Sequence, residues 1–87
     1  SGGEIKMFEF RLIDISKNKY ENLFKHPFKF LPNQGDWIEM DIEDKGTVYE
    51  VIKVVHSSKG LDSDIYVKFV GLTPVALQSL VQKGDNP

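Results

Sequence analysis

The fold is decided by residues 35–70, which read GDWIEMDIEDKGTVYEVIKVVHSSKGLDSDIYVKFV. Apolar and polar residues alternate over 37–42, while 48–56 and 65–70 are rich in β-branched and aromatic residues, a pattern typical of strands. These segments predict three β-strands joined by two turns. The residues expected to face the core are Ile38, Met40, Ile42, Ile52, Val54, Ile65, Val67 and Phe69.

Turn-forming residues flank the first of these strands. Residues 31–36 predict a turn, because Pro32 fixes φ and Gly35 permits a positive φ. Residues 43–46 predict a four-residue hairpin loop with Gly46 in the left-handed conformation.

The segment after residue 72 predicts a helix over about residues 74–83. Thr73 is a good N-cap, Pro74 suits the first helical position, and Gly84 supplies a stop. Leu77, Leu80 and Val81 fall on one face of this helix.

The segment before residue 16 predicts a first strand, in which apolar residues recur at every second position from Phe8. The apolar phase slips by one residue at Leu12 and Ile13. Either a bulge bends the strand there, or the end of the strand is buried on both faces. Residues 20–27 then predict a short helical turn or an irregular loop, followed by an extended piece at 28–31.

The length of 87 residues predicts a single domain, because a second core would fall below the size that usually folds unaided. Residues 1–3 are interpreted as a cloning remnant or the trimmed end of a longer precursor, and residues 4–87 as one β-barrel domain. Cysteine is absent, which excludes disulfides and thiolate metal sites. No apolar run approaches the roughly 20 residues that span a bilayer, so we expect a soluble protein without a membrane partner. The absence of cysteine fits a reducing interior such as the cytoplasm but leaves the compartment undetermined.

The net charge of −2 conceals an uneven distribution. Residues 36–64 carry three Lys/Arg against eight Asp/Glu and stand at −5. Residues 1–35 have a net charge of +2, and residues 65–87 have a net charge of +1. Because phosphate neutralisation dominates affinity for nucleic acids, this balance does not favour a nucleic-acid binder.

The turn Leu31-Pro32-Asn33-Gln34-Gly35-Asp36, which feeds a strand and two further hairpin strands, resembles an arrangement found in SH3-like barrels. The resemblance covers about Ile5 to Val70 and lies at the level of architecture. It implies a small, curved antiparallel barrel of four to five strands, here with a C-terminal helix where such barrels commonly end in a strand. Small barrels of this kind also resemble components of phage particles and mobile elements. SH3-like barrels host many unrelated activities, so the resemblance specifies no function.

Acidic residues and histidines are the first candidates for chemistry. The densest acidic group comprises Asp36, Glu39, Asp41, Glu43, Asp44 and Glu50. Its spacing matches no EF-hand loop, and we interpret it as a solvated strand face whose charges discourage edge pairing. His26 and His56 could meet a carboxylate in space, but no third ligand stands at diagnostic spacing. With no serine elbow or phosphate-binding loop either, we expect no enzyme, no metal site and no cofactor.

Aromatic residues are the most informative candidates for binding. Some lie beside basic residues in the expected 24–30 loop and others lie on the expected sheet. The candidate binding residues are Phe24, Lys25, His26, Phe28, Lys29, Phe30, Trp37, Tyr49 and Tyr66. Exposed aromatics can grip a proline-rich peptide or stack on unpaired bases, and the alternative is that they cap the open ends of a small core.

We therefore expect a non-enzymatic protein-interaction or self-assembly module, with a protein partner or further copies of itself. The alternative is a single-stranded nucleic-acid-binding barrel. In that case the basic and aromatic 24–30 loop would bind the strand and Trp37 would stack on bases.

Overall fold

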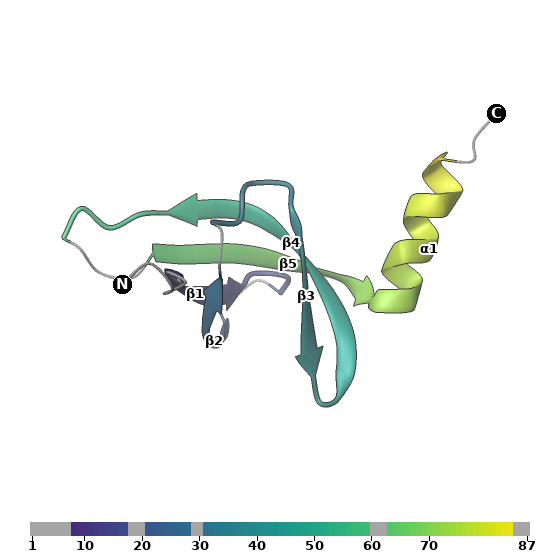
Figure 1. Cartoon of the computed structure of the whole chain (residues 1–87), viewed down its shortest axis with the longest axis horizontal. Coiled ribbons are helices and arrows are strands. Elements are labelled where there is room, and N and C mark those ends of the chain that lie inside the picture. Colours follow the sequence, from purple (N-terminus) through teal and green to yellow (C-terminus); the bar gives the residue numbers. More distant parts are fainter. Residues whose placement is uncertain (1–7, 18–20, 29–30, 60–62, 85–87) are drawn as a thin grey trace, which may run out of the picture.

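The computed structural model describes residues 8–17, 21–28, 31–59 and 63–84. Within these ranges the elements are β1 (Phe8–Asp14), β2 (Glu21–Phe28), β3 (Trp37–Ile42), β4 (Lys45–Val55), β5 (Ser63–Leu72) and α1 (Thr73–Gly84). Figure 1 shows a strongly curled sheet with α1 standing beyond the end of β5. The expected fold class, a mainly β chain with a curled sheet and a C-terminal helix, is confirmed.

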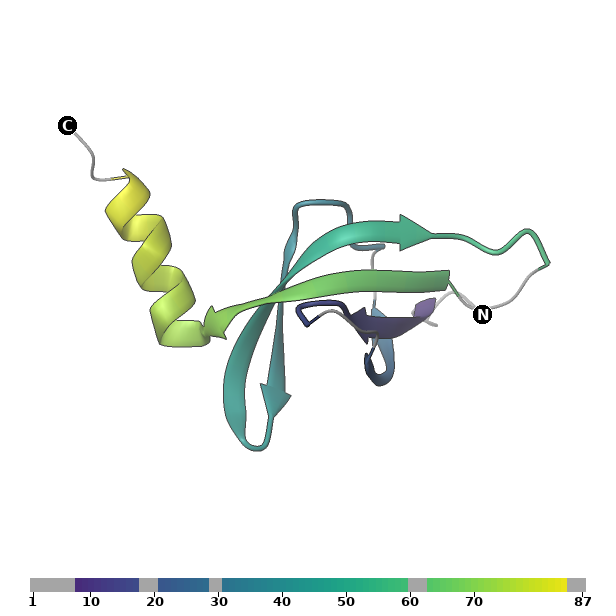
Figure 2. The same cartoon turned by 180° about the vertical axis from the view of Figure 1, so that it is seen from behind.

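The five strands form one sheet in the order β2-β1-β5-β4-β3. The reverse view shows β5 in the middle, between β4 and β1 (Figure 2). Three strand pairs are antiparallel, but β1 runs parallel to β5, a departure from the fully antiparallel barrel that the sequence predicts. Hairpin turns make consecutive strands antiparallel, whereas three strands separate β1 from β5 and no turn fixes their relative direction. The SH3-like resemblance stays a prediction.

Side chains reinforce the parallel pair. Arg11 of β1 lies at the register position of Asp64 in β5, and its Nε and Nη2 donate to the two carboxylate oxygens at 2.9 and 3.1 Å. Just beyond β1, the hydroxyl of Ser16 accepts the backbone N–H of Phe69 at 2.7 Å. Both contacts join residues 53 positions apart, so they fix the β1–β2 hairpin to the rest of the sheet.

The irregularity expected in the first strand is present. The register of β1 against β2 shifts between Leu12 and Ile13, which leaves Leu23 of β2 as the extra residue of a bulge. Leu12 and Ile13 are also both buried, although neighbouring strand residues face opposite sides. The bulge and the burial of both faces therefore occur together.

Residues 21–28 form a strand, and the expected helical turn or loop is wrong there. The helical spacing involved Tyr20, which lies outside the described residues. Pairing with β1 over seven register positions outweighs so short a pattern. Pro27 is tolerated because β2 is an outer strand of the sheet.

The hydrophobic core lies on one face of the curled sheet. It consists of Phe10, Leu12, Ile38, Met40, Tyr49, Val51, Ile65 and Val67, with Ile42 and Val54 packed against it. Four of the expected core residues are thus confirmed as buried: Ile38, Met40, Ile65 and Val67.

Two expected core residues lie elsewhere. Ile52 is only partly buried, and Phe69 is 52% exposed. The register of β4 against β5 shifts twice, and Ile52 and Val70 are the residues left over. Each shift changes which residues face the core, so Val51 points inward in place of Ile52.

The turn before β3 forms as predicted. Gly35 has a φ of 92°. The backbone N–H of Asp36 donates to the carbonyl of Asn33 at 3.0 Å, and the Asp36 carboxylate accepts the N–H of Asn33 at 2.9 Å. Two hydrogen bonds between Asn33 and Asp36, one between backbone groups and one to a side chain, therefore close this turn.

The hairpin between β3 and β4 differs from the prediction. Its loop has two residues, Glu43 and Asp44, with φ values of 51° and 64°, and Gly46 lies within β4. Two successive positive φ values define a type I′ turn, whose twist matches that of the flanking strands. The four-residue loop with Gly46 in the left-handed conformation is therefore wrong.

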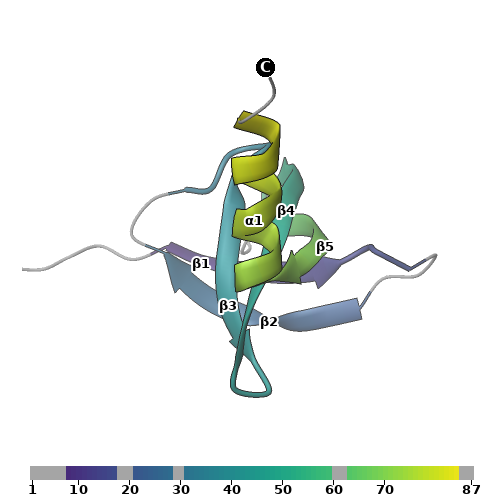
Figure 3. The same ribbon diagram turned by 90° about the vertical axis from the view of Figure 1, so that its right-hand side faces the viewer.

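The helix α1 begins directly after β5, and its bounds agree with the prediction to within one residue. The hydroxyl of Thr73 donates to the carboxylate of Glu39 in β3 at 2.6 Å. Figure 3, viewed from the helix end, shows β1 and β2 crossing the direction of β3 and β4. The helix thus extends from one end of a curled sheet.

Candidate protein-interaction surface

The predicted basic and aromatic loop is part of the sheet. Phe24, Lys25, His26 and Phe28 belong to β2, at the register positions of β1 residues, and their side chains lie outside the described part of the chain. Lys29 and Phe30 lie outside the described residues altogether. No described contact gathers these six residues into a site.

The three aromatic candidates of the sheet do not form one surface. Tyr49 is buried in the core, where its ring meets Phe69 edge-on at a centroid distance of 5.9 Å. Trp37 lies opposite Glu50, on the other face, and its indole N–H donates to the Glu50 carboxylate at 3.3 Å. Tyr66 stands between two buried residues of β5, so it too is on the outer face. Tyr49, one of the candidate binding residues, is therefore part of the core.

Several of the acidic side chains have structural partners. Glu39 accepts a hydrogen bond from Thr73, Glu50 accepts one from Trp37, and Asp36 closes a turn. Among the described residues, no three His, Asp or Glu side chains lie close enough together to hold a metal ion. Glu39 and Asp41 are exposed on β3, as expected for a charged strand face.

The exposed apolar side chains are concentrated at one end of the chain. Six of the eight exposed large apolar residues in the described segments lie between positions 69 and 81. These six define the β5–α1 apolar surface: Phe69, Leu72, Val75, Leu77, Leu80 and Val81. The helical spacing of Leu77, Leu80 and Val81 indicates their shared face from sequence alone, but the exposure of that face is visible only in the structure.

The helix is attached to the sheet through its first turns. Ala76 is only 1% exposed. Two glycines of the sheet make room for this contact: a Cβ on Gly46 would lie 2.8 Å from Thr73 Oγ1, and one on Gly71 would lie 3.6 Å from Val75 Cγ1. Beyond this point Leu77, Leu80 and Val81 are all exposed.

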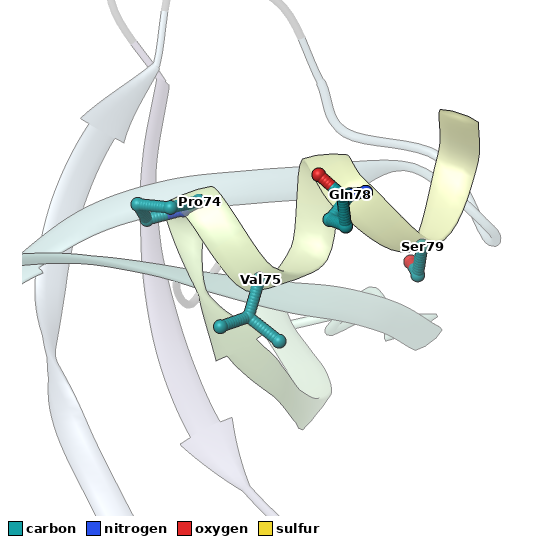
Figure 4. Close-up of a pocket in the computed structure, with 4 residues that line it drawn as sticks. All are labelled: Pro74, Val75, Gln78 and Ser79. Atoms are coloured by element: carbon teal, nitrogen blue, oxygen red, sulfur yellow. The ribbon is translucent and has the colours of Figure 1, made fainter. Parts of the chain in front are cut away.

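The other side of α1 borders a hollow. Figure 4 shows Pro74, Val75, Gln78 and Ser79 lining it, and its volume is about 430 Å³. With 3.6 residues per turn, Val75 lies on the opposite side of the helix from Leu77. Val75 and Val81 are both 64% exposed, so α1 presents apolar side chains on two sides.

The β5–α1 apolar surface contains no charged residue, and the only charged residue of α1 is Lys83 in its last turn. This contrasts with residues 36–64, which stand at −5. Charge is depleted at the centres of protein interfaces, where large apolar side chains are common. The chemistry of this surface therefore suits contact with another protein.

None of the helices in the described ranges is long and apolar enough to cross a membrane. No protein-family model, curated protein or solved structure matches the chain. Its function has to be inferred from its own surface.

Proposed function

We propose that this chain is a non-enzymatic protein-interaction or self-assembly module that binds through the β5–α1 apolar surface. The observation that supports this most directly is the exposure of Leu77, Leu80 and Val81 on one face of α1. An apolar helix face in a globular protein normally packs against a core. Here that face is left for a partner to cover.

Covering this surface would release a useful amount of free energy. Full burial of one such side chain is worth about 1.5–3 kcal/mol, so covering its exposed half is worth about 1 kcal/mol. Six such side chains together contribute roughly 6 kcal/mol per chain. Burial of these side chains would also stabilise the helical conformation of α1, because a 12-residue helix is only marginally stable in water without packing.

The module would act as one component of a larger assembly. Such a role needs a rigid scaffold and a contact surface, and it needs neither a cofactor nor a catalytic group. It agrees with the resemblance to small barrels of phage particles and mobile elements. A protein partner, or further copies of the chain, would supply the missing cover for α1.

Paired double variants test the proposal. The wild-type chain is tethered and offered a lysate of its source cells, and its self-association is measured separately by light scattering. Both are repeated with Leu77→Gln/Val81→Gln and with Leu31→Gln/Val55→Gln, which alters the two exposed large apolar residues of the described segments that lie outside the β5–α1 apolar surface. We expect the first variant to lose association with itself or with a defined lysate protein, and the second to keep it. No association in the wild type, or equal association in all three, would contradict the proposal.

A further inference from the structure

Building on the proposed function, we infer that α1 pairs with α1 of a second copy of this chain, antiparallel and about a twofold axis. The residues that carry the inference repeat with coiled-coil spacing. Thr73, Leu77, Leu80 and Gly84 stand four, three and four positions apart, which places them along one seam of the helix. Val81 flanks this seam and is exposed with Leu77 and Leu80.

A second copy fits the seam because the seam is self-complementary. In a twofold dimer the same surface patch faces itself, so a charged patch would meet its own charge. From residue 73 to residue 82 the helix carries no charged side chain. A foreign partner is usually selected by complementary charges at the contact, and between Thr73 and Gln82 the helix itself offers none.

Of the two outer strands, β3 disfavours contact between copies along its edge. Glu39 and Asp41 are exposed on this strand. In a symmetric antiparallel pair these carboxylates would face their own copies, and like charges opposite each other are destabilising. Because of this repulsion, the helix face, uncharged from residue 73 to residue 82, is a more favourable contact for a second copy than the edge of β3.

The antiparallel orientation follows from the way α1 is attached. Its start is fixed to the sheet and its other end points away from it (Figure 1). A parallel pair would bring two sheets together, each with a segment that stands at −5. An antiparallel pair places the sheets at opposite ends and lets the helix dipoles oppose each other favourably.

The size of the contact predicts a weak dimer. A 12-residue helix is about 18 Å long. Two such helices bury an area near the lower limit of specific interfaces, about 1,000 Å² in total. We therefore expect a dissociation constant on the order of 100 μM.

Sedimentation velocity of the full chain, from about 1 μM to about 1 mM, tests the inference. The wild type should pass from monomer to dimer in this range, and Leu77→Gln/Val81→Gln should weaken the dimer by about tenfold or more. Leu31→Gln/Val55→Gln should dimerise like the wild type, and circular dichroism checks that both variants keep α1. A wild type that stays monomeric throughout would overturn the inference. The proposed function would survive that result if Leu77 and Val81 still governed capture of a different protein.

Cross-linking then locates the contact. The chain has no cysteine, so Leu80→Cys and Val75→Cys each introduce a single thiol. Oxidation at dimer-forming concentration should give a covalent dimer with the Leu80→Cys chain and far less with the Val75→Cys chain. Equal cross-linking of the two would show that the copies do not meet along this seam and would overturn the inference.

Discussion

Replacing Gly46 by alanine should weaken the fold by displacing the start of α1. A Cβ at this position would lie 2.8 Å from Thr73 Oγ1 and 3.2 Å from Glu39 Oε2, and both distances are shorter than ordinary contacts. The Thr73 side chain is short and cannot make room by a small shift, so its hydroxyl would have to rotate away from the new methyl group. The 2.6 Å hydrogen bond from Thr73 to Glu39 would then be lost.

The expected cost can be estimated from three effects. A hydrogen bond to a carboxylate at an exposed position contributes about 1–2 kcal/mol. Glu39 also places a negative charge at the start of a helix that has no acidic residue in its own first turn, worth about 0.5 kcal/mol. Alanine is favoured over glycine within a strand by about 0.5–1 kcal/mol. The net loss in the free energy of unfolding is about 1 kcal/mol, or a melting temperature lower by about 4–8 °C.

Urea unfolding followed by the fluorescence of Trp37, the single tryptophan, measures this loss. Gly71→Ala is the matched control, because its nearest new contact is an ordinary 3.6 Å and the variant should match or exceed the wild type. In a Thr73→Ala background the Thr73 oxygen is gone and the remaining Thr73 Cβ distance is 3.5 Å, while the Glu39 carboxylate, no longer bonded to Thr73, can move away. Gly46→Ala should no longer destabilise there. If Gly46→Ala proves as stable as Gly71→Ala, the steric explanation is refuted.

Three further outcomes are expected. Asp44→Gly should raise the free energy of unfolding by about 0.5–1 kcal/mol in the same urea assay, because Asp44 has a φ of 64°; an unchanged value would mean that the turn is not strained. Ser16→Ala removes the hydroxyl that accepts the N–H of Phe69 at 2.7 Å, so that amide should exchange faster and stability should fall by about 0.5–1 kcal/mol. Because the indole of Trp37 donates to Glu50, oligonucleotides at low salt should leave its fluorescence unquenched, and salt-dependent quenching would favour the nucleic-acid alternative.

The parts of the fold that depend on neighbouring residues could be predicted from sequence. Strand β3 alternates cleanly, the turn at Gly35 has proline and glycine at informative positions, and α1 follows Thr73 and Pro74. In each case the deciding residues lie within about one turn or one strand of one another, so local patterns are sufficient.

The parts that depend on distant residues could not be predicted. β2 is a strand because β1 pairs with it, and β1 is parallel to β5 because of contacts such as Arg11 with Asp64. The bulge at Ile52 lies within a continuous run of strand-forming residues, so nothing in the run marks where the inward face changes. A prediction that carries one alternating pattern through β4 and misses this bulge also places Tyr49 outside the core, where the structure has it inside.

The candidate surface shows the same limit. The face that contains Leu77, Leu80 and Val81 follows from helical spacing, but spacing does not say whether the sheet covers it. That depends on where α1 stands, which is set by Gly46, Gly71 and the Glu39 carboxylate on three different strands.

The exposure of α1 follows from the chain connection. β5 ends at Leu72 and α1 begins at Thr73, so no linker residues are available to turn the helix back over the sheet. The bond from Thr73 to Glu39 fixes the direction in which the helix leaves, and the tight space above Gly46 leaves little room for another. A helix that could swing would bury its leucines against its own sheet, because that burial is favourable. The connection that holds the start of α1 in place therefore also keeps Leu77, Leu80 and Val81 available to a partner.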